Sequence, residues 1–569
     1  MAFFSPRKSR GKNYWSICES RRINGKPKNI PIEYLGTADT LLARLNQENE
    51  VTVNSYSHGD TAALLNVANE LAVINTINKY IPPLKSGSGP VRNDLSVGTS
   101  ILLAAIGRAC HPTSKMGWYD WCQNTSLEYC LKNSFVDLDS QHFWDQMQRL
   151  PAEHIPLIEE ELVKNIFDKS DLKLDLLLYD TTNFFTFIDS QNLACKIPKR
   201  GKNKQKRSDL RQFGMALLVT KDEQIPLFHK TYQGNKNDIT SFKENFSGLL
   251  SRLRNVTKQL ADVTMVFDKG NNSRDNFKKI DNETQLYYVA GLVPSYFKDL
   301  IEEANKNYST IKIDDLELPA YRIKKEVWGK ERTCLVTISQ QLKEGQIQGI
   351  YQHLEKKYKD LEEFKRQLEN PKNHKQYSKE EIENRLQKII KGQFIEEILK
   401  YNLLEIPEGK LSFTYHIDYD CFNKLKEEVL GRKILITNRH EWSNEEIILA
   451  YKGQAKVEYV FKNFKNPYHL AIRPQFHWTD QKIEVHVLIC VISYLLTRVA
   501  YSRARKKAGY KRNINNFLSD LRKIRLACIL RKKGLKVNYQ LENIPDTLAN
   551  VVKVLNISND TIRPHGLLL

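Results

Sequence analysis

The sequence has few of the cysteine patterns that indicate an oxidising compartment or a metal bound by cysteine thiolates. Its nine cysteines are scattered singly, and no two have the spacing of a zinc knuckle or a redox motif. The 13 histidines are dispersed and form no metal-binding pattern. An odd number of isolated cysteines predicts reduced, mostly structural thiols, as in a cytoplasmic protein.

Long apolar segments are also missing. The longest apolar run covers residues 485–496 and contains His486, which is short of the roughly 20 residues that cross a bilayer. The first residues include no apolar stretch of the kind found in signal peptides. We therefore expect a buried helix at this run and no membrane partner.

Acidic residues are in deficit. The 569-residue chain has 67 Asp and Glu against 87 Lys and Arg, a formal net charge of +20. A protein this basic usually meets a polyanion, because neutralising phosphates releases counterions. The alternative is a basic protein without such a partner. Hydrophobic residues make up 41% of the chain, which excludes a disordered protein, and the length indicates several folding units.

Near the N-terminus, two alternating segments, Tyr14–Ile17 and Ile30–Leu35, flank Asn24 and Gly25. Asn-Gly is a favoured tight-turn pair, so the pattern predicts a β-hairpin. A helical region follows. From Leu172 onward, short apolar runs alternate with helical segments, which predicts an α/β core.

Two of these apolar runs are each followed by an aspartate, Asp180 in LLLYDTTNFF and Asp268 in TMVFDKGNNS. A carboxylate at the end of a core strand stands where open α/β sheets place their sites. Further on, Tyr451, Glu458 and Lys465 recur every seven residues in YKGQAKVEYVFKNFK, along one face of a predicted helix. Taken singly, each feature also fits a solvated strand end or a structural ion-pair face.

Taken together and in order, these blocks resemble the bacterial transposases of the insertion-sequence 4 superfamily. The resemblance runs from about Leu172 to Val499 and includes ILITNRHEWSNEEIILAYKGQAKVEYVFKNFK, which matches the Tyr-(2)-Arg-(3)-Glu-(6)-Lys signature of that group at its Tyr, Glu and Lys positions. It implies an RNase H-like core with Asp180, Asp268 and Glu458 as catalytic, metal-binding acids. The Arg position of the signature holds Gln454 here, so the phosphate-binding charge implied there is missing.

The resemblance also implies a chemistry. Hard oxygen ligands suit Mg²⁺, with Mn²⁺ as a substitute. Asp180 would bridge two ions, with Asp268 on one and Glu458 on the other, so that a water or a DNA 3′-hydroxyl is activated and the leaving oxygen is stabilised. The implied reaction is cleavage at the ends of an insertion sequence, followed by joining of the freed 3′ ends to target DNA.

DNA contacts are expected at two places. Tyr451 and Lys465 share the face of Glu458 and would bind phosphates near the scissile bond. The segment 196–211 has eight basic residues and one acid, and it would either grip DNA or remain a solvated loop. Its candidate contacts are Lys199, Arg200, Lys204, Arg207 and Arg211.

We expect the RNase H-like core to be interrupted by a largely helical insertion. Ile347, Leu354, Leu361 and Leu368 repeat every seven residues, which predicts a helical hairpin there. The expected regions are an N-terminal β-hairpin region (1–60), a helical DNA-binding region (61–170), the core (171–291 and 431–501), the insertion (292–430) and a basic C-terminal region (502–569).

Two rival functions use the same residues. The first is an RNase H-like metal-dependent nuclease that cuts without joining, and the second is a domesticated, non-catalytic DNA-binding protein. Loss of an acid would indicate the second, and all three acids are present. We expect a cytoplasmic bacterial protein whose partners are the terminal inverted repeats, target DNA and a second copy of itself in the DNA complex.

Overall fold

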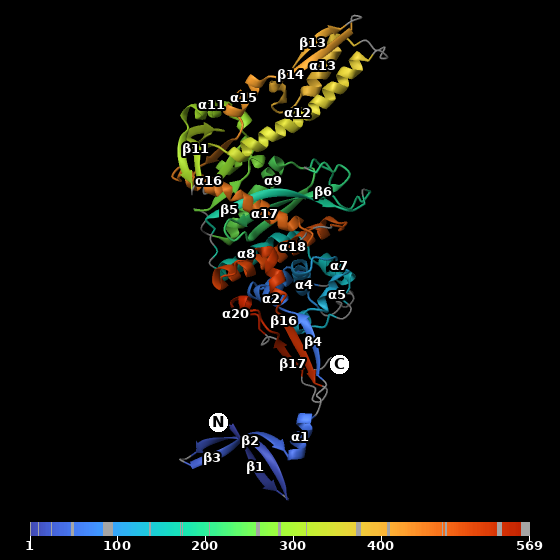
Figure 1. Ribbon diagram of the computed structural model, residues 1–569, viewed down its shortest axis with the longest axis vertical. Helices are drawn as coiled ribbons and strands as arrows, with labels where there is room; N and C mark the ends of the chain where they lie inside the picture. The colour runs from blue at the N-terminus through green and yellow to red at the C-terminus, as the bar shows by residue number, and fades with distance from the viewer. Residues whose placement is uncertain are drawn as a thin grey trace. The chain divides into compact units, whose positions relative to one another are not determined.

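A computed structural model provides the architecture (Figure 1). The chain divides into a smaller unit (residues 1–63, 119–136 and 508–569) and a larger unit (64–118 and 137–507). The residues described are 2–9, 11–23, 26–46, 51–83, 95–135, 138–170, 172, 174–189, 191–203, 205–257, 262–282, 286–313, 316–370, 377–406, 410–468, 470, 472, 475–531 and 537–558. The predicted Asn24–Gly25 turn and the predicted DNA contact Lys204 lie outside them.

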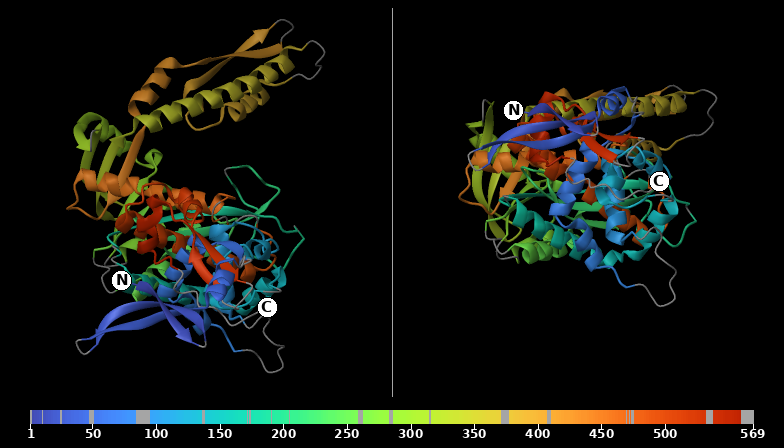
Figure 2. Two further views of the ribbon diagram at one scale, coloured as in Figure 1. Left: turned by 60° about the horizontal axis from the view of Figure 1, so that its bottom comes forward. Right: turned by 90° about the horizontal axis from the view of Figure 1, so that it is seen from below.

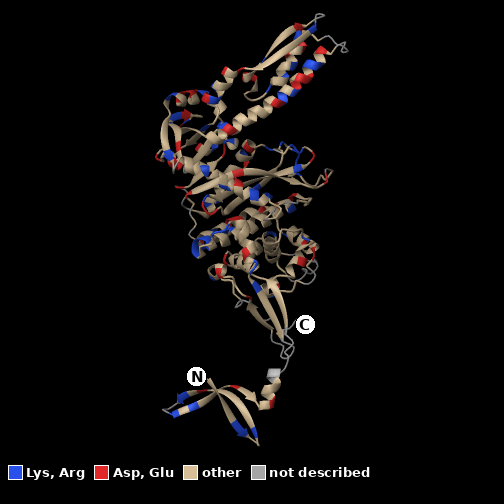
Figure 3. Cartoon of the chain, in the orientation of Figure 1, with Lys and Arg blue, Asp and Glu red and all other residues tan. Residues whose placement is uncertain are grey.

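The smaller unit begins with a three-stranded antiparallel sheet of β1 (Ala2–Ser9), β2 (Lys12–Ile23) and β3 (Lys26–Gly36), followed by α1 (Ala38–Asn46). Strands β2 and β3 pair antiparallel, which confirms the predicted hairpin, and β1 is an additional strand. Figure 3 shows clusters of basic residues along this sheet.

The described residues of the C-terminal region, expected as a basic tail, form helices and strands. It forms α19 (Ile514–Leu521), β16 (Arg525–Arg531), β17 (Val537–Leu541) and α20 (Ala549–Val554). Strand β16 lies between β17 and the N-terminal strand β4 (Val51–Ser57), so two regions predicted to be separate share one sheet. Local sequence patterns could not predict this pairing, because it joins strands from opposite ends of the chain.

The described residues between 61 and 170 are mainly helical. Ser96 caps α4 by accepting a hydrogen bond from the backbone N–H of Thr99, which satisfies one of the free donors at the start of a helix. The helices are α2 (Gly59–Glu70), α3 (Val73–Lys79), α4 (Val97–Cys110), α5 (Trp118–Cys122), α6 (Leu127–Leu131), α7 (Ser140–Arg149) and α8 (Ile155–Lys169).

The larger unit contains a nine-stranded sheet in the order β10-β11-β12-β15-β9-β8-β5-β6-β7. Strands β5, β8 and β9 are mutually parallel, and the remaining neighbours pair antiparallel. This confirms a mixed α/β core, and β7, which begins at Pro226, is an edge strand, where a residue without a backbone N–H is tolerated. The strands are β5 (Leu176–Thr186), β6 (Arg211–Thr220), β7 (Pro226–Gln233), β8 (Thr264–Phe267), β9 (Tyr287–Leu292), β10 (Ser309–Ile313), β11 (Leu316–Val327), β12 (Lys330–Ile338) and β15 (Arg432–Thr437).

The segment 292–430, expected to leave the sheet, does so only in part. Strands β10, β11 and β12 extend the sheet beyond β15, so this stretch belongs to the sheet and not to an excursion. The alternation of polar and apolar residues in these strands is short, and no local sequence pattern indicates that β12 pairs with β15.

The rest of the segment forms an arm that stands away from the sheet (Figures 1 and 2). Leu354, Leu361 and Leu368 are buried in a hydrophobic core of the arm itself, as their seven-residue spacing predicts. A two-stranded sheet, which the sequence did not indicate, completes it. The arm consists of α12 (Gln340–Glu369), α13 (Lys379–Ile390), α14 (Ile395–Ile398), β13 (Leu399–Ile406), β14 (Lys410–Ile417) and α15 (Tyr419–Glu428).

Among the described residues, one helix, α18 (Asp480–Ala508), is long and apolar enough to cross a membrane by length and composition alone. Its most apolar stretch is 94% buried within the protein. A helix that packs against protein on all sides is apolar all round, so burial accounts for the composition of α18. The helices α9 (Asp238–Val256), α10 (Arg274–Asp281), α11 (Lys298–Asn307), α16 (Asn444–Lys452) and α17 (Gln454–Lys465) complete the larger unit.

Candidate active site

Parallel pairing places Asp180 beside Asp268. Strand β5 pairs with β8 through Tyr179 and Phe267, and the two aspartates are the next residues on their chains. Neighbouring strands lie about 4.8 Å apart, and paired positions face the same side of a sheet. The prediction that β5 ends at Asp180 is wrong, because β5 continues to Thr186 and pairs with β6 throughout.

A hydrogen bond from the Tyr451 hydroxyl to Asp268 Oδ1, 2.7 Å long, fixes the second aspartate. Gly291 of β9 leaves space for the Tyr451 hydroxyl, because a Cβ at position 291 would lie 2.5 Å from that oxygen. Burial, followed by the negative charge of Asp268, raises the pKa of Tyr451, so the phenol remains protonated and can donate.

The single helix predicted to carry Tyr451, Glu458 and Lys465 is broken at Gly453 into α16 and α17. Tyr451 therefore belongs to one helix, and Glu458 and Lys465 belong to the next. A Cβ at position 453 would lie 2.8 Å from the carbonyl oxygen of Ala450, so the junction is tight. Gln454 is buried, and its Nε2 donates to the backbone oxygen of Tyr179 at 2.9 Å.

The residue at the signature's Arg position therefore holds the start of α17 against β5, next to Asp180. Its side chain is 6% exposed, which makes it a packing contact and not a surface charge.

Asp180 lies in an environment of excess negative charge. Burial, opposed by a 2.8 Å hydrogen bond from the backbone N–H of Thr181, raises the pKa of Asp180 to about 7. The charges of Asp268, Asp238 and Glu458 raise it further. Asp268, Asp238 and Glu458 therefore lie near enough to Asp180 to act on its carboxyl group, and the assignment of Asp180, Asp268 and Glu458 as one catalytic set stays a prediction.

The donor set at this site suits a divalent cation, because carboxylate oxygens are hard ligands and a cation would relieve their repulsion. Within the described residues, no three His, Cys, Asp or Glu side chains are gathered closely enough to hold an ion. Glu458 is exposed on α17, whereas Asp180 and Asp268 are partly buried on the sheet.

Two further side chains border the acids. Lys465 donates through Nζ to Thr182 Oγ1, at the end of α17 that lies over β5. Asp238, the first residue of α9, accepts a 2.8 Å hydrogen bond from Thr181 Oγ1. The sequence did not single out Asp238, although its place in GNKND, directly before a helix, is a local signal that could have drawn attention to it.

The described residues of the basic segment 196–211 differ in exposure. Lys199 and Arg200 are exposed, and backbone hydrogen bonds pair Lys199 with Gln212. Arg207 is exposed and forms an ion pair with Asp209 at 2.6 Å. Arg211 is partly buried and donates to the carbonyl oxygen of Asn192 at 2.8 Å, so it has a structural partner within the protein.

The transposase DDE domain family matches residues 185–496, which is more than half of the 569-residue chain. The chain belongs to this family. The match includes Asp268 and Glu458 and begins shortly after Asp180. The protein is therefore a DDE-type transposase, and the site built from β5, β8 and α17 lies in or beside its family domain.

Two other comparisons complete the picture of this DDE transposase. No curated protein matches its sequence. Among solved structures, it is similar to a piggyBac transposase in a synaptic complex with hairpin DNA, with a TM-score of 0.39 and 10% identity over 81% of this chain and 79% of that one. A likeness this loose supports no inference about fold or function.

Proposed function

We propose that this DDE transposase cuts the ends of an insertion sequence and joins their 3′ ends to target DNA. The observation that carries the proposal is that Asp268 and Glu458, which come from distant parts of the chain, lie near enough to Asp180 for their charges to raise its pKa. A buried carboxyl group with a raised pKa and two further acids nearby suit a site that receives cations and phosphate oxygens.

The finer classification is also a proposal. We assign the protein to the insertion-sequence 4 superfamily with an RNase H-like core. The order β7-β6-β5-β8-β9 supports this, since three antiparallel strands are followed by two strands parallel to β5. Tyr451, Glu458 and Lys465, which match the signature, all border the same site.

DDE transposases use divalent metal ions, and we propose Mg²⁺, with Mn²⁺ as a substitute, held by Asp180, Asp268 and Glu458. The ions would supply activation of a water or a DNA 3′-hydroxyl and stabilisation of the leaving oxygen. Tyr451 holds Asp268 in place through its hydroxyl. Lys465, at the end of α17 beside Thr182, would bind a phosphate of the cleaved strand.

We further propose that the protein works in the bacterial cytoplasm as a homodimer on DNA that contains the terminal inverted repeats. The net charge of +20 supports a polyanionic partner. Lys199, Arg200 and Arg207 are exposed near the start of β6 and could contact phosphates. Arg211 is a weaker candidate because its guanidinium already donates within the protein.

The decisive experiment uses Asp268→Asn, which keeps the shape of the side chain and removes a negative ligand. End-DNA binding should remain near normal, while cleavage and strand transfer of a labelled 3′-hydroxyl end in Mg²⁺ should both fail. Asp262→Asn is a matched control, because Asp262 is exposed just before β8. Normal strand transfer by Asp268→Asn would place the catalytic centre elsewhere, and cleavage without joining by the unaltered protein would favour the nuclease.

A further inference from the structure

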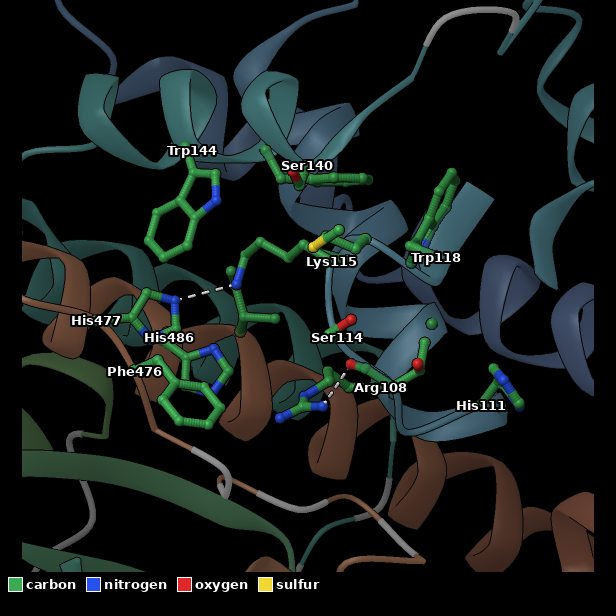
Figure 4. Close-up of a pocket in the computed structure, with 16 residues that line it drawn as sticks. Arg108, His111, Ser114, Lys115, Trp118, Ser140, Trp144, Phe476, His477 and His486 are labelled. Atoms are coloured by element: carbon green, nitrogen blue, oxygen red, sulfur yellow. Dashed lines mark hydrogen bonds between the residues drawn. The ribbon is translucent and has the colours of Figure 1, made fainter. Parts of the chain in front are cut away.

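A pocket of about 250 Å³ lies in the larger unit, apart from the carboxylates, between α4, α7 and the start of α18 (Figure 4). Four aromatic side chains line it: Trp118, Phe143, Trp144 and Phe476. Trp118 and Phe143 are buried and meet edge to face at 4.9 Å between ring centroids, whereas Phe476 is 58% exposed. The volume suits one ring system with its substituent and not a large ligand.

The same pocket carries positive charge without a matching acid. Lys115 Nζ lies 3.1 Å from His477 Nε2, and Figure 4 shows it between Trp144 and the histidines. Lys115 and Lys482 place their ammonium groups 5.2 and 5.1 Å from the Trp144 ring centroid. Among the described residues, no carboxylate contributes to the pKa of Lys115, which burial and the nearby cation Arg108 lower to about 7.

The hydrogen bonds of the pocket are incomplete. His477 Nδ1 is bonded to Gln475 Oε1, which leaves His477 Nε2 as the acceptor for Lys115. His486 Nε2 donates to the carbonyl oxygen of Ile472 at 3.0 Å, and His486 Nδ1 is then a buried acceptor without a partner. Arg108 Nε is a buried donor without a partner. Buried polar atoms left unpaired in a native protein call for a missing partner.

These features together specify a ligand chemistry. Aromatic walls accept a planar ring, Arg108, Lys115 and Lys482 attract an anion, and the unpaired donor and acceptor suit the edge of a heterocycle. We propose that this pocket binds one nucleotide, whose base contacts the aromatic side chains and whose phosphate lies near the three cations. The nucleotide could be a free mononucleotide or an unpaired nucleotide of bound DNA, and the second source rests on the proposed function.

Two substitutions test the pocket without disturbing the core. Phe476→Ala removes an exposed aromatic wall, and Lys115→Met keeps the length of the side chain but removes its charge. Phe187→Ala is the matched aromatic control, because Phe187 is 46% exposed and its ring centroid lies 6.0 Å from that of Phe476, outside the pocket. Lys356→Met, on the exposed face of α12, is the charge control. Thermal melting of each variant checks that it is folded.

The first measurement is equilibrium dialysis of the full chain with labelled deoxynucleoside monophosphates. The second compares the Kd for a duplex that carries one unpaired nucleotide with the Kd for the same duplex fully paired. Binding in the first, or a preference for the unpaired nucleotide in the second, should weaken roughly 5- to 150-fold in Phe476→Ala and Lys115→Met. The two control variants should bind like the unaltered protein.

The two measurements separate the sources. If mononucleotides bind, the ligand is a free nucleotide. If the only effect is a preference for the duplex with one unpaired nucleotide, the ligand is a nucleotide of bound DNA. Neither effect in the folded protein, or equal effects in pocket and control variants, overturns the proposal. Normal strand transfer by Asp268→Asn, with nucleotide binding intact, would overturn the proposed function and leave the pocket standing, so the two failures are distinguishable.

Discussion

Asp180 should make the metal-free protein less stable as the pH rises. Its pKa is 3.8 in an unfolded chain and about 7 in the folded protein, so folding favours the protonated form. The loss of folding free energy caused by ionised Asp180 is absent below about pH 4, grows between pH 4 and 7, and is constant above pH 7. A difference of about three pKa units corresponds to about 4 kcal/mol in the free energy of unfolding at pH 8, and to about 2 kcal/mol at pH 5.

Asp180→Asn removes this penalty, because an amide does not ionise. The larger unit has more than 400 residues, so its entropy of unfolding is about 0.9 kcal/mol/K and 4 kcal/mol corresponds to about 4 °C in Tm. We therefore expect the variant to melt about 4 °C above the unaltered protein at pH 8, and about 2 °C above it at pH 5. Mg²⁺ should close the gap at pH 8 by binding the unaltered site.

The assay is thermal melting at both pH values, with and without Mg²⁺. Asp175→Asn is the matched control, because Asp175 is exposed just before the same strand, and its Tm should change little. A gain in Tm for Asp180→Asn that is equal at pH 5 and pH 8 would refute the reasoning. So would a gain at pH 8 that Mg²⁺ leaves unchanged, since the acids would then not form a cation site.

Three further outcomes are expected. Lys465→Gln should weaken DNA binding modestly and lower the slope of log K against log salt by about one unit, with cleavage reduced but detectable; an unchanged slope would make Lys465 structural. Gly291→Ala should push the Tyr451 hydroxyl off Asp268 and slow cleavage without weakening DNA binding, whereas Gly248→Ala, which has open space at its Cβ, should not. Lys115, with a pKa of about 7, should be acetylated at pH 7 faster than other lysines by a small anhydride, as measured by mass spectrometry.

The sequence located the acids but not how they are assembled. Asp180 and Asp268 follow apolar runs that are readable as strands, and their parallel pairing then sets them side by side. Asp238 does not follow an apolar run, and its place beside Asp180 depends on its hydrogen bond with Thr181, 57 positions away in the sequence. Local patterns report the period and the burial of a segment, whereas contacts of this kind depend on the tertiary arrangement.

The helix break is a second example. The seven-residue spacing of Tyr451, Glu458 and Lys465 suggested one straight helix, yet Gly453 divides it and the side chains still reach the same site. Gly453 has helical backbone angles, so its conformation gives no signal. The break follows from the close packing of α17 on β5, which includes the hydrogen bond from Gln454 to Tyr179.

The place of β15 between β9 and β12 has a consequence for synthesis of the chain. Strands β9 and β12 are both complete before the arm is made, yet the strand that joins them comes only after α15. At about 5 to 20 residues per second, the ribosome needs roughly 5 to 20 s to pass from β12 to β15. During that interval two apolar strand edges stand open, and such edges pair readily with other chains. An arm with its own hydrophobic core can fold in that time, which brings its two ends together and prepares the gap that β15 then closes.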